Sequence, residues 1–238
     1  GDGIPGDLMM PRMCDVDDED HLWIVDTQNH RMLKMGANLD RVALQLGVTG
    51  VAGDDERHLN LPADVTWSKA GDIFVADGYG NNRVVKFTKD GKFLKAWGGG
   101  PETKCARDGQ FHLPHSIAVD AADRLYVVDR ENRRVQIFDT EGKFLGKWTH
   151  VGNPWGIEIS REQRDDYAFL TDHSTEQVIK VRVSDGSIVA RFGGPGRGPG
   201  QFDWAHGIAI DSRGAVYVSD TYGQRVQKFV SAGTTSLQ

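Results

Sequence analysis

The sequence has few of the features that mark disulfide-stabilised, membrane-spanning or nucleic-acid-binding proteins. Its 238 residues include only two cysteines, Cys14 and Cys105, which are too few for a disulfide framework and leave the compartment open. No apolar run approaches the roughly 20 residues that span a bilayer. The formal net charge of −6 argues against nucleic-acid binding, because neutralising phosphates requires a basic surface. We therefore expect neither a membrane span nor a nucleic-acid partner.

An amphipathic helix pattern of useful length is also missing. The apolar residues occur instead in short runs that are rich in β-branched and aromatic side chains and are broken by Gly and Asp turns. Such runs predict antiparallel strands. With a hydrophobic fraction of 39%, the chain can bury a substantial core, so we expect one folded all-β domain over residues 1–238.

One unit recurs five times along the chain. The copies are LWIVDTQNHRMLKM at 22–35, IFVADGYGNNRVVKF at 73–87, LYVVDRENRRVQIF at 125–138, AFLTDHSTEQVIKV at 168–181 and VYVSDTYGQRVQKF at 216–229. Their marker aspartates are Asp26, Asp77, Asp129, Asp172 and Asp220, at steps of 51, 52, 43 and 48 residues. These steps are in or near the range of propeller blades.

Further apolar runs surround each unit. A preceding run, such as HSIAV at 115–119, and a closing run, such as FLGKW at 144–148, give four strands per blade. We expect an all-β propeller of the NHL-repeat kind, with blades near 8–47, 59–98, 111–149, 152–193 and 202–230. The first blade lacks a convincing preceding strand and the last stops after its third. Since closure requires complete blades, we expect a six-bladed ring with one blade missing upstream.

The strand order of a blade predicts which residues share a face. The first two strands form an antiparallel hairpin, so the start of the first and the end of the second lie at the same rim. The first strand is innermost in a propeller, and its first residue points near the central channel. Residues at these two places therefore form the candidate site.

Recurring residues are most simply architectural, so the candidate site is sought among those that differ between blades. The arginines after the marker aspartate and the aromatics that end the fourth strands recur, and we expect them to join loops and blades. They are Arg31, Arg83, Arg134, Arg225, Trp97, Trp148 and Phe192. At the start of the first strand the blades differ, with Arg12, Ala63, His115, Trp155 and His206. After the marker aspartate they differ again, with Thr27, Tyr79, Arg130, His173 and Thr221.

His115 and His206 occupy equivalent positions of different blades, so they are expected to converge on the axis. Neutral imidazoles are zinc ligands, and a catalytic zinc takes three protein ligands and one open position. A third ligand is not obvious: His173 shares the face but lies in a loop. The remaining histidines, such as His30, fall in turns or outer segments and are expected at the surface.

Three segments carry a resemblance to a known family. DGYGNNRVVKF at 77–87, GQFHLPHSIAVD at 109–120 and DRENRRVQIF at 129–138 are similar to peptidyl-α-hydroxyglycine α-amidating lyase, a zinc propeller that completes C-terminal peptide amidation. The similarity runs over roughly residues 8–230. It implies a lyase that releases a peptide amide and glyoxylate, acting on a small-molecule or C-terminal peptide substrate, and it implies an extracytoplasmic location.

The resemblance also implies roles for individual residues. His115 and His206 match two zinc histidines, Tyr79 matches the catalytic base, and Arg130 matches a substrate-binding arginine. A metal lowers the pKa of a bound hydroxyl, and a nearby phenol can take its proton.

The chain departs from the family at several of these positions. Arg12 stands where the first zinc histidine is expected, and a cation there repels zinc. Gly207 replaces an aspartate associated with a structural calcium, which makes calcium doubtful, and Trp204 replaces a methionine. Gly80 and Tyr126 replace the cysteines of a loop disulfide.

Two functions therefore stay open at the level of sequence. The first is a zinc-dependent carbon–nitrogen lyase that uses Tyr79, Arg130, His115 and His206. The second is a non-catalytic NHL propeller that binds a peptide or protein partner on the same face, which Arg12 and the missing blade favour.

Overall fold

The computed structural model describes residues 8–99, 107–161 and 166–230 of the chain. Within these residues the fold is all-β, with 19 strands in five antiparallel sheets and only single turns of helix between them. The chain forms two compact units: residues 1–150 hold the first three sheets and residues 151–238 the last two. The expected all-β class and the five blades are confirmed.

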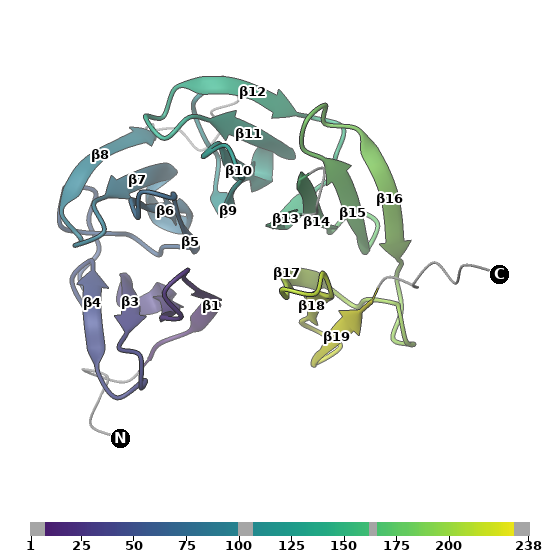
Figure 1. Ribbon diagram of the computed structural model, residues 1–238, viewed down its shortest axis with the longest axis horizontal. Coiled ribbons are helices and arrows are strands. Elements are labelled where there is room, and N and C mark those ends of the chain that lie inside the picture. The colour runs from purple at the N-terminus through teal and green to yellow at the C-terminus, as the bar shows by residue number, and fades with distance from the viewer. Residues whose placement is uncertain (1–7, 100–106, 162–165, 231–238) are drawn as a thin grey trace. The chain divides into compact units, whose positions relative to one another are not determined.

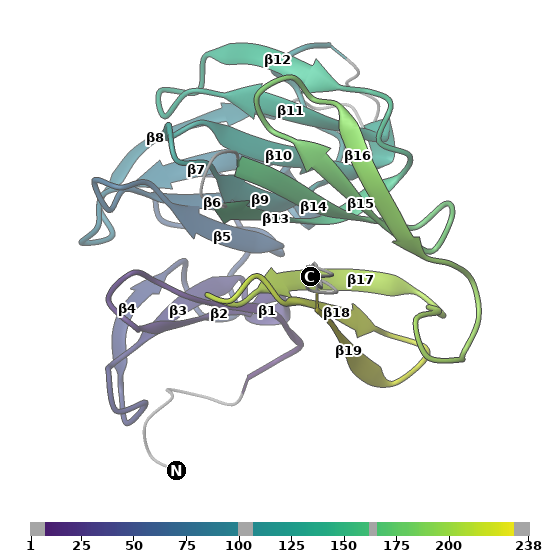
Figure 2. The same ribbon diagram turned by 45° about the vertical axis from the view of Figure 1, so that its right-hand side comes forward.

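Unit 1, residues 1–150, contains three four-stranded blades, each a simple meander (Figure 1). Blade 1 consists of β1 (Pro11–Val16), β2 (Leu22–Asp26), β3 (Arg31–Met35) and β4 (Val42–Leu46). Blade 2 consists of β5 (Asp64–Trp67), β6 (Ile73–Asp77), β7 (Arg83–Phe87) and β8 (Phe93–Gly98). Blade 3 consists of β9 (Pro114–Val119), β10 (Leu125–Asp129), β11 (Arg134–Phe138) and β12 (Phe144–Trp148). Figure 2 shows the strands of blade 3 lying side by side in chain order.

Unit 2, residues 151–238, contains two blades. Blade 4 consists of β13 (Pro154–Arg161), β14 (Asp166–Asp172), β15 (Gln177–Arg182) and β16 (Ile188–Gly193). Blade 5 has three strands within the described residues: β17 (Ala205–Ile210), β18 (Val216–Asp220) and β19 (Arg225–Phe229).

One expectation about blade 1 is wrong. β1 is a genuine first strand that pairs with β2, although its sequence, PRMCDV, carries two charged residues and gave no convincing strand pattern. The partly buried residues of β1 are Arg12, Met13 and Asp15, two of which are charged, so the strand lacks the apolar alternation that would mark it in the sequence. The sixth blade and the single-domain organisation stay predictions. Cys14 is free and exposed, and Cys105 lies outside the described residues.

The core lies between neighbouring sheets. On β6, Ile73 and Val75 pack in a cluster shared with blade 1, whereas Phe74 and Ala76 pack in one shared with blade 3. Both faces of the strand are therefore buried, which explains its unbroken apolar run. The aromatics that end the fourth strands take part in this packing: Trp97 lies 6.1 Å from Phe138 between ring centroids.

The marker aspartate and the following arginine form an ion pair in each blade that has both, and the pair is buried in blades 1, 2 and 3. In blade 1, Arg31 Nε donates to Asp26 Oδ2 at 2.8 Å, and both side chains are 0% exposed. The other carboxylate oxygen accepts the backbone N–H of Met9 at 2.7 Å, in the segment that leads into β1. The pair thus fastens the approach to the first strand onto the end of the second, which confirms the expected architectural role.

A further contact joins successive blades within unit 1. The turn between the second and third strands ends in a left-handed residue, His30 with φ of 56° in blade 1 and Asn82 with φ of 54° in blade 2. His30 Nδ1 accepts the N–H of Leu61 at 3.0 Å, and Asn82 Oδ1 accepts the N–H of Leu113 at 2.8 Å. We call this contact the interblade clasp. His30, expected at the surface, is therefore a half-buried link to the next blade.

Candidate functional site

The start of each first strand lies beside the end of the second, as the sequence predicted. The observed backbone pairs are Pro11 with Asp26, Pro114 with Asp129, Pro154 with Asp172 and Ala205 with Asp220. Residues at the first-strand start and residues just after the marker aspartate therefore share a rim within each blade.

The first strands are irregular at the positions that vary between blades. The pairing register shifts between Pro11 and Cys14 in β1, and the same interruption occurs at the start of β9, β13 and β17. The candidate residues Arg12, His115, Trp155 and His206 lie inside these irregular stretches. Bulges of this kind re-aim side chains and are common beside functional sites.

Four side chains gather in unit 1 and form what we call the tyrosine cluster: Arg12, Tyr79, His115 and Arg130. The rings of Tyr79 and His115 meet edge to face, with centroids 5.6 Å apart. The guanidinium carbon of Arg12 lies 4.7 Å from the Tyr79 ring centroid and that of Arg130 lies 5.6 Å from it. The structure thus brings together Tyr79, Arg130 and His115 with Arg12, which was a possible additional site residue.

Close backbone approach places Tyr79 in this cluster. Tyr79 lies on α1 (Gly78–Asn81), a single turn that follows the marker aspartate of blade 2. A Cβ atom at Gly78 would collide with the carbonyl oxygen of Pro114, at the start of β9. Only glycine therefore allows the turn to lie against blade 3, next to His115.

Asp64, on β5, fixes the strand segment that follows His115. Its Oδ2 accepts Ser116 Oγ–H at 2.7 Å and the N–H of Ile117 at 3.0 Å, and its Oδ1 accepts the N–H of Val65 at 2.9 Å. Burial raises the pKa of this carboxyl to about 7, against the opposing effect of the three hydrogen bonds. Asp64 thereby joins the first strands of blades 2 and 3 beneath the tyrosine cluster.

The Tyr79 hydroxyl is buried, and the Arg130 guanidinium is a near polar neighbour. Burial raises the pKa of Tyr79 above its ordinary value, and the positive charges of Arg12 and Arg130 act in the opposite direction. Arg130 is held by Glu131, whose Oε1 accepts its Nε–H at 2.9 Å. The hydroxyl of Tyr79 is therefore shielded from solvent, and its ring lies beside two guanidinium groups.

A second group of side chains gathers in unit 2, and we call it the tryptophan cluster: Trp155, His173, Trp204, His206 and Tyr222. The His173 ring lies between two indoles, with centroid distances of 4.5 Å to Trp155 and 4.4 Å to Trp204. Trp155 also meets His206 at 5.5 Å, and Trp204 meets Tyr222 at 4.7 Å. Tyr222 is 58% exposed, so the cluster reaches the surface of the unit.

Glu176 organises the tryptophan cluster through the unit 2 version of the interblade clasp. Its Oε2 accepts the N–H of Trp204 at 3.2 Å and that of Ala205 at 2.7 Å, and its Oε1 lies 3.0 Å from His173 Nδ1. Trp204 has φ of 91°, a conformation that a bulky residue rarely adopts. The carboxylate therefore holds an unfavourable backbone just before His206.

The two predicted zinc histidines lie in different units, so their convergence stays a prediction. Across residues 8–99, 107–161 and 166–230, no group of three or more His, Cys, Asp or Glu is arranged to hold a metal ion. The described residues of neither unit by themselves offer the three ligands of a catalytic zinc. In unit 1, His115 is accompanied by the guanidinium groups of Arg12 and Arg130.

Sequence reasoning missed Asp64 and Glu176. Asp64 stands at the start of β5, and the available signal was a charged residue between Ala63 and Val65 in the otherwise uncharged run ADVTW. Glu176 takes the position filled by Asn82 in blade 2, and comparison of the repeats at that position could have singled it out.

Comparison with known proteins agrees with the blades. The NHL repeat model matches residues 59–87, 111–138 and 202–229, which lie in blades 2, 3 and 5. No helix in the described residues is both long and apolar enough to cross a membrane.

Several curated proteins are similar to the chain. Peptidyl-glycine alpha-amidating monooxygenase A of Xenopus laevis is 33% identical over 93% of this chain and 24% of its own length. A probable peptidyl-alpha-hydroxyglycine alpha-amidating lyase of Caenorhabditis elegans is 28% identical over 93% of this chain and 64% of its own. NHL repeat-containing protein 3 of Homo sapiens is 30% identical over 89% and 63%. The chain thus spans about a quarter of the length of the monooxygenase.

Among solved structures, a catalytically inactive variant of virginiamycin B lyase from Staphylococcus aureus has a TM-score of 0.67 and 16% identity over 96% of this chain and 69% of its own. At that identity the likeness concerns the fold. The chain is an NHL-repeat β-propeller protein that resembles the peptidyl-α-hydroxyglycine α-amidating lyases.

Proposed function

We propose that the chain is a carbon–nitrogen lyase of the amidating type, which cleaves a peptidyl-α-hydroxyglycine to the peptide amide and glyoxylate. One observation carries the proposal: the buried Tyr79 hydroxyl belongs to a ring that lies beside one imidazole and two guanidinium groups. A peptide substrate and an extracytoplasmic location belong to the same proposal.

The two arginines supply the charge that such a substrate needs. A peptidyl-α-hydroxyglycine ends in a carboxylate, and guanidinium groups bind carboxylates through paired N–H donors. Arg130 and Arg12 both lie against the Tyr79 ring, so a carboxylate bound by them brings the adjacent hydroxyl group to the phenol.

Tyr79 takes the proton of the substrate hydroxyl in this scheme. The hydroxyl oxygen then forms the carbonyl of glyoxylate, the bond between the α-carbon and the amide nitrogen breaks, and the nitrogen gains a proton to complete the amide. Because burial raises the pKa of Tyr79, the phenol is protonated near neutral pH, and its use as a base requires more positive charge than the two arginines provide.

Zinc enters the proposal through His115 and His206. When bound, it would polarise the substrate hydroxyl and lower the pKa values of groups around it. Since the part of each unit that the structure describes does not supply three ligands, no step above depends on the metal.

The test measures glyoxylate release from a peptidyl-α-hydroxyglycine by the purified chain, with and without added zinc. Tyr79→Phe removes the proton acceptor and is expected to lower kcat by a factor of about 100 or more. His115→Ala is expected to lower bound zinc, measured by elemental analysis.

Tyr217→Phe serves as the matched control, because Tyr217 donates to Asp211 at 3.0 Å, away from the marker-aspartate rim. Equal turnover by Tyr79→Phe and the unaltered chain would contradict the proposed role, as would the absence of glyoxylate under all conditions.

A second candidate is a non-catalytic propeller that binds a peptide or protein. Two observations favour it: Arg12 occupies the position of an expected zinc ligand, and the tryptophan cluster reaches the surface through Tyr222. Aromatic side chains of this kind are common anchors of binding surfaces. Peptide binding that persists in Tyr79→Phe, is lost in Trp204→Ala and occurs without glyoxylate release would select this candidate.

A further inference from the structure

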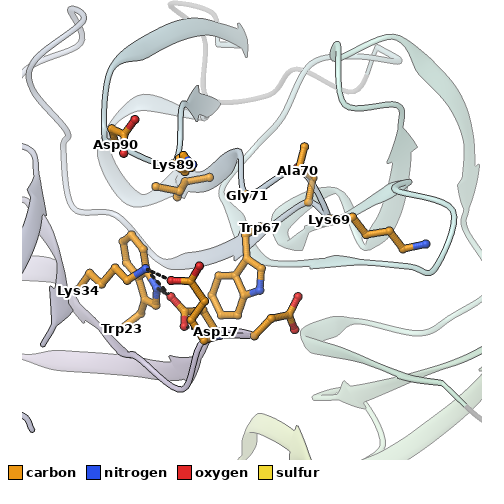
Figure 3. A pocket seen from close by; sticks show the side chains of 13 residues that line it. Asp17, Trp23, Lys34, Trp67, Lys69, Ala70, Gly71, Lys89 and Asp90 are labelled. Atoms are coloured by element: carbon orange, nitrogen blue, oxygen red, sulfur yellow. Dashed lines mark hydrogen bonds and ion pairs between the residues drawn. The ribbon is translucent and has the colours of Figure 1, made fainter. Parts of the chain in front are cut away.

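A cavity of about 400 Å³ lies in unit 1, at the turns that join β1 to β2, β5 to β6 and β7 to β8. These turns are at the other ends of the strands from α1, so the cavity is separate from the tyrosine cluster. Figure 3 shows its lining, in which Trp23, Trp67 and Asp17 lie close together and Lys69 and Lys89 come from the neighbouring turns. Its volume falls in the range of small-molecule sites.

Two stacked tryptophans form the aromatic wall. The rings of Trp23 and Trp67 have centroids 6.3 Å apart and an interplanar angle of 22°. Trp23 is 2% exposed and donates its Nε1–H to Asp17 Oδ2 at 3.1 Å, so it is fixed behind the wall. Trp67 is half-buried, and its indole is the ring that a ligand can reach.

Ser68 supplies a polar group that lacks an internal use. The residue is 4% exposed, and its Oγ has no hydrogen-bond partner within the described residues. Its backbone N–H and C=O are both engaged in the turn, with Asp72 at 2.9 Å and Gly71 at 2.8 Å. A buried hydroxyl without a partner is unfavourable, so a bound molecule that reaches this group would supply a missing hydrogen bond.

The charges that line the cavity are mixed and do not select an ionic ligand. Four carboxylates and three ammonium groups line it, so neither sign dominates. Lys34 Nζ lies 2.7 Å from Asp17 Oδ2 and 5.7 Å from the centroid of the Trp23 ring. The place of a cation above that ring is therefore already taken by the protein itself. Asp18 and Lys89 also line the cavity.

We propose that this cavity binds a neutral saccharide through a single pyranose ring. The C–H face of the ring packs on Trp67, as apolar groups pack on indoles. Its hydroxyl groups, which both donate and accept, bond to the Ser68 hydroxyl, the Asp18 carboxylate and the Lys89 ammonium group. The mixture of one aromatic wall, one hydroxyl and charges of both signs fits a polyhydroxylated neutral ring better than an anion or an organic cation.

The test is ligand-observed NMR by saturation transfer, because this readout does not depend on the chain's own tryptophans. The intact chain is titrated with the neutral methyl pyranosides of glucose, galactose, mannose and N-acetylglucosamine, and in parallel with glucuronate and tetramethylammonium. At least one neutral pyranoside is expected to bind with a dissociation constant on the order of 1 mM.

Three variants locate the site. Trp67→Ala is expected to weaken binding at least about tenfold, and Ser68→Ala about threefold, without loss of stability because its hydroxyl has no partner to lose. Lys143→Ala is the control. Lys143 is exposed in the turn between β11 and β12, which corresponds in blade 3 to the turn between β7 and β8, and this variant is expected to bind as the unaltered chain does.

Three results would overturn the proposal. They are the absence of saturable binding by all four neutral pyranosides up to about 100 mM, tighter binding of glucuronate or tetramethylammonium than of any neutral sugar, and unchanged binding in both Trp67→Ala and Ser68→Ala. None of these results bears on glyoxylate release.

Discussion

The substitution Asp26→Asn tests how much of the stability of a blade depends on the buried ion pair that recurs along the chain. Asp26 and Arg31 are both 0% exposed, and their Oδ2 to Nε distance is 2.8 Å. The same carboxylate accepts Asn29 Nδ2–H at 2.8 Å and the N–H of Met9 at 2.7 Å. Asparagine keeps the shape of the side chain, but it removes the charge and turns one acceptor into a donor.

The magnitude follows from these contacts. Removing one partner of a buried ion pair leaves the other charge without compensation and typically costs about 3–5 kcal/mol. In a chain of this size that lowers the midpoint of thermal unfolding by roughly 6–20 °C. The double variant Asp26→Asn/Arg31→Gln removes the uncompensated charge as well and is expected to recover part of the loss.

The assay is urea unfolding followed by circular dichroism, with Glu141→Gln as the control. Glu141 is 66% exposed and its Oε1 lies 2.7 Å from Lys86 Nζ, so neutralising it is expected to cost less than about 1 kcal/mol. If Asp26→Asn lowers the free energy of unfolding no more than Glu141→Gln does, the reasoning about the marker aspartates is refuted.

Three further predictions concern the clasp, the placement of the tyrosine and a buried carboxyl. Asn82→Ala removes the acceptor of the Leu113 N–H and is expected to lower the free energy of unfolding by about 1–3 kcal/mol. Asn82→Asp keeps an acceptor oxygen, so it should lower the free energy of unfolding less in the same urea titration. Gly78→Ala forces the α1 turn away from β9, so the Tyr79 ring resonances should shift in NMR spectra; unchanged shifts would contradict the close approach. Because the pKa of Asp64 is raised to about 7, its contribution favours folding at low pH and is lost as pH rises from about 4 to about 7, by at most about 4 kcal/mol. Asp64→Asn should therefore flatten the fall in the free energy of unfolding over that pH interval, and an identical slope in both proteins would refute the assignment.

The blades could be predicted from the sequence because their structure is local. Each sheet is a meander in which successive strands are joined by short turns, so the apolar runs and the marker aspartates fix both the strands and the rim on which their ends lie. The sequence placed Tyr79, His115 and Arg130 at this rim, but the contact of Tyr79 with His115 and Arg130 joins blades 2 and 3 and depends on how these blades pack. The pairing of His115 with His206 is not local in this sense, and it stays a prediction.

The interblade contacts and the cavity were decided by tertiary structure alone. Whether His30 lies at the surface or accepts a hydrogen bond depends on how near Leu61, 31 residues later, approaches it. Likewise Ser68 has the sequence pattern of an ordinary turn residue, and only folding buries its hydroxyl and brings the residue to a cavity that Trp23 of the preceding blade also lines. The sequence pattern of a strand encodes which face of the strand is apolar. It does not encode which side chain of a neighbouring sheet comes within hydrogen-bonding distance, because that depends on how whole sheets pack against one another.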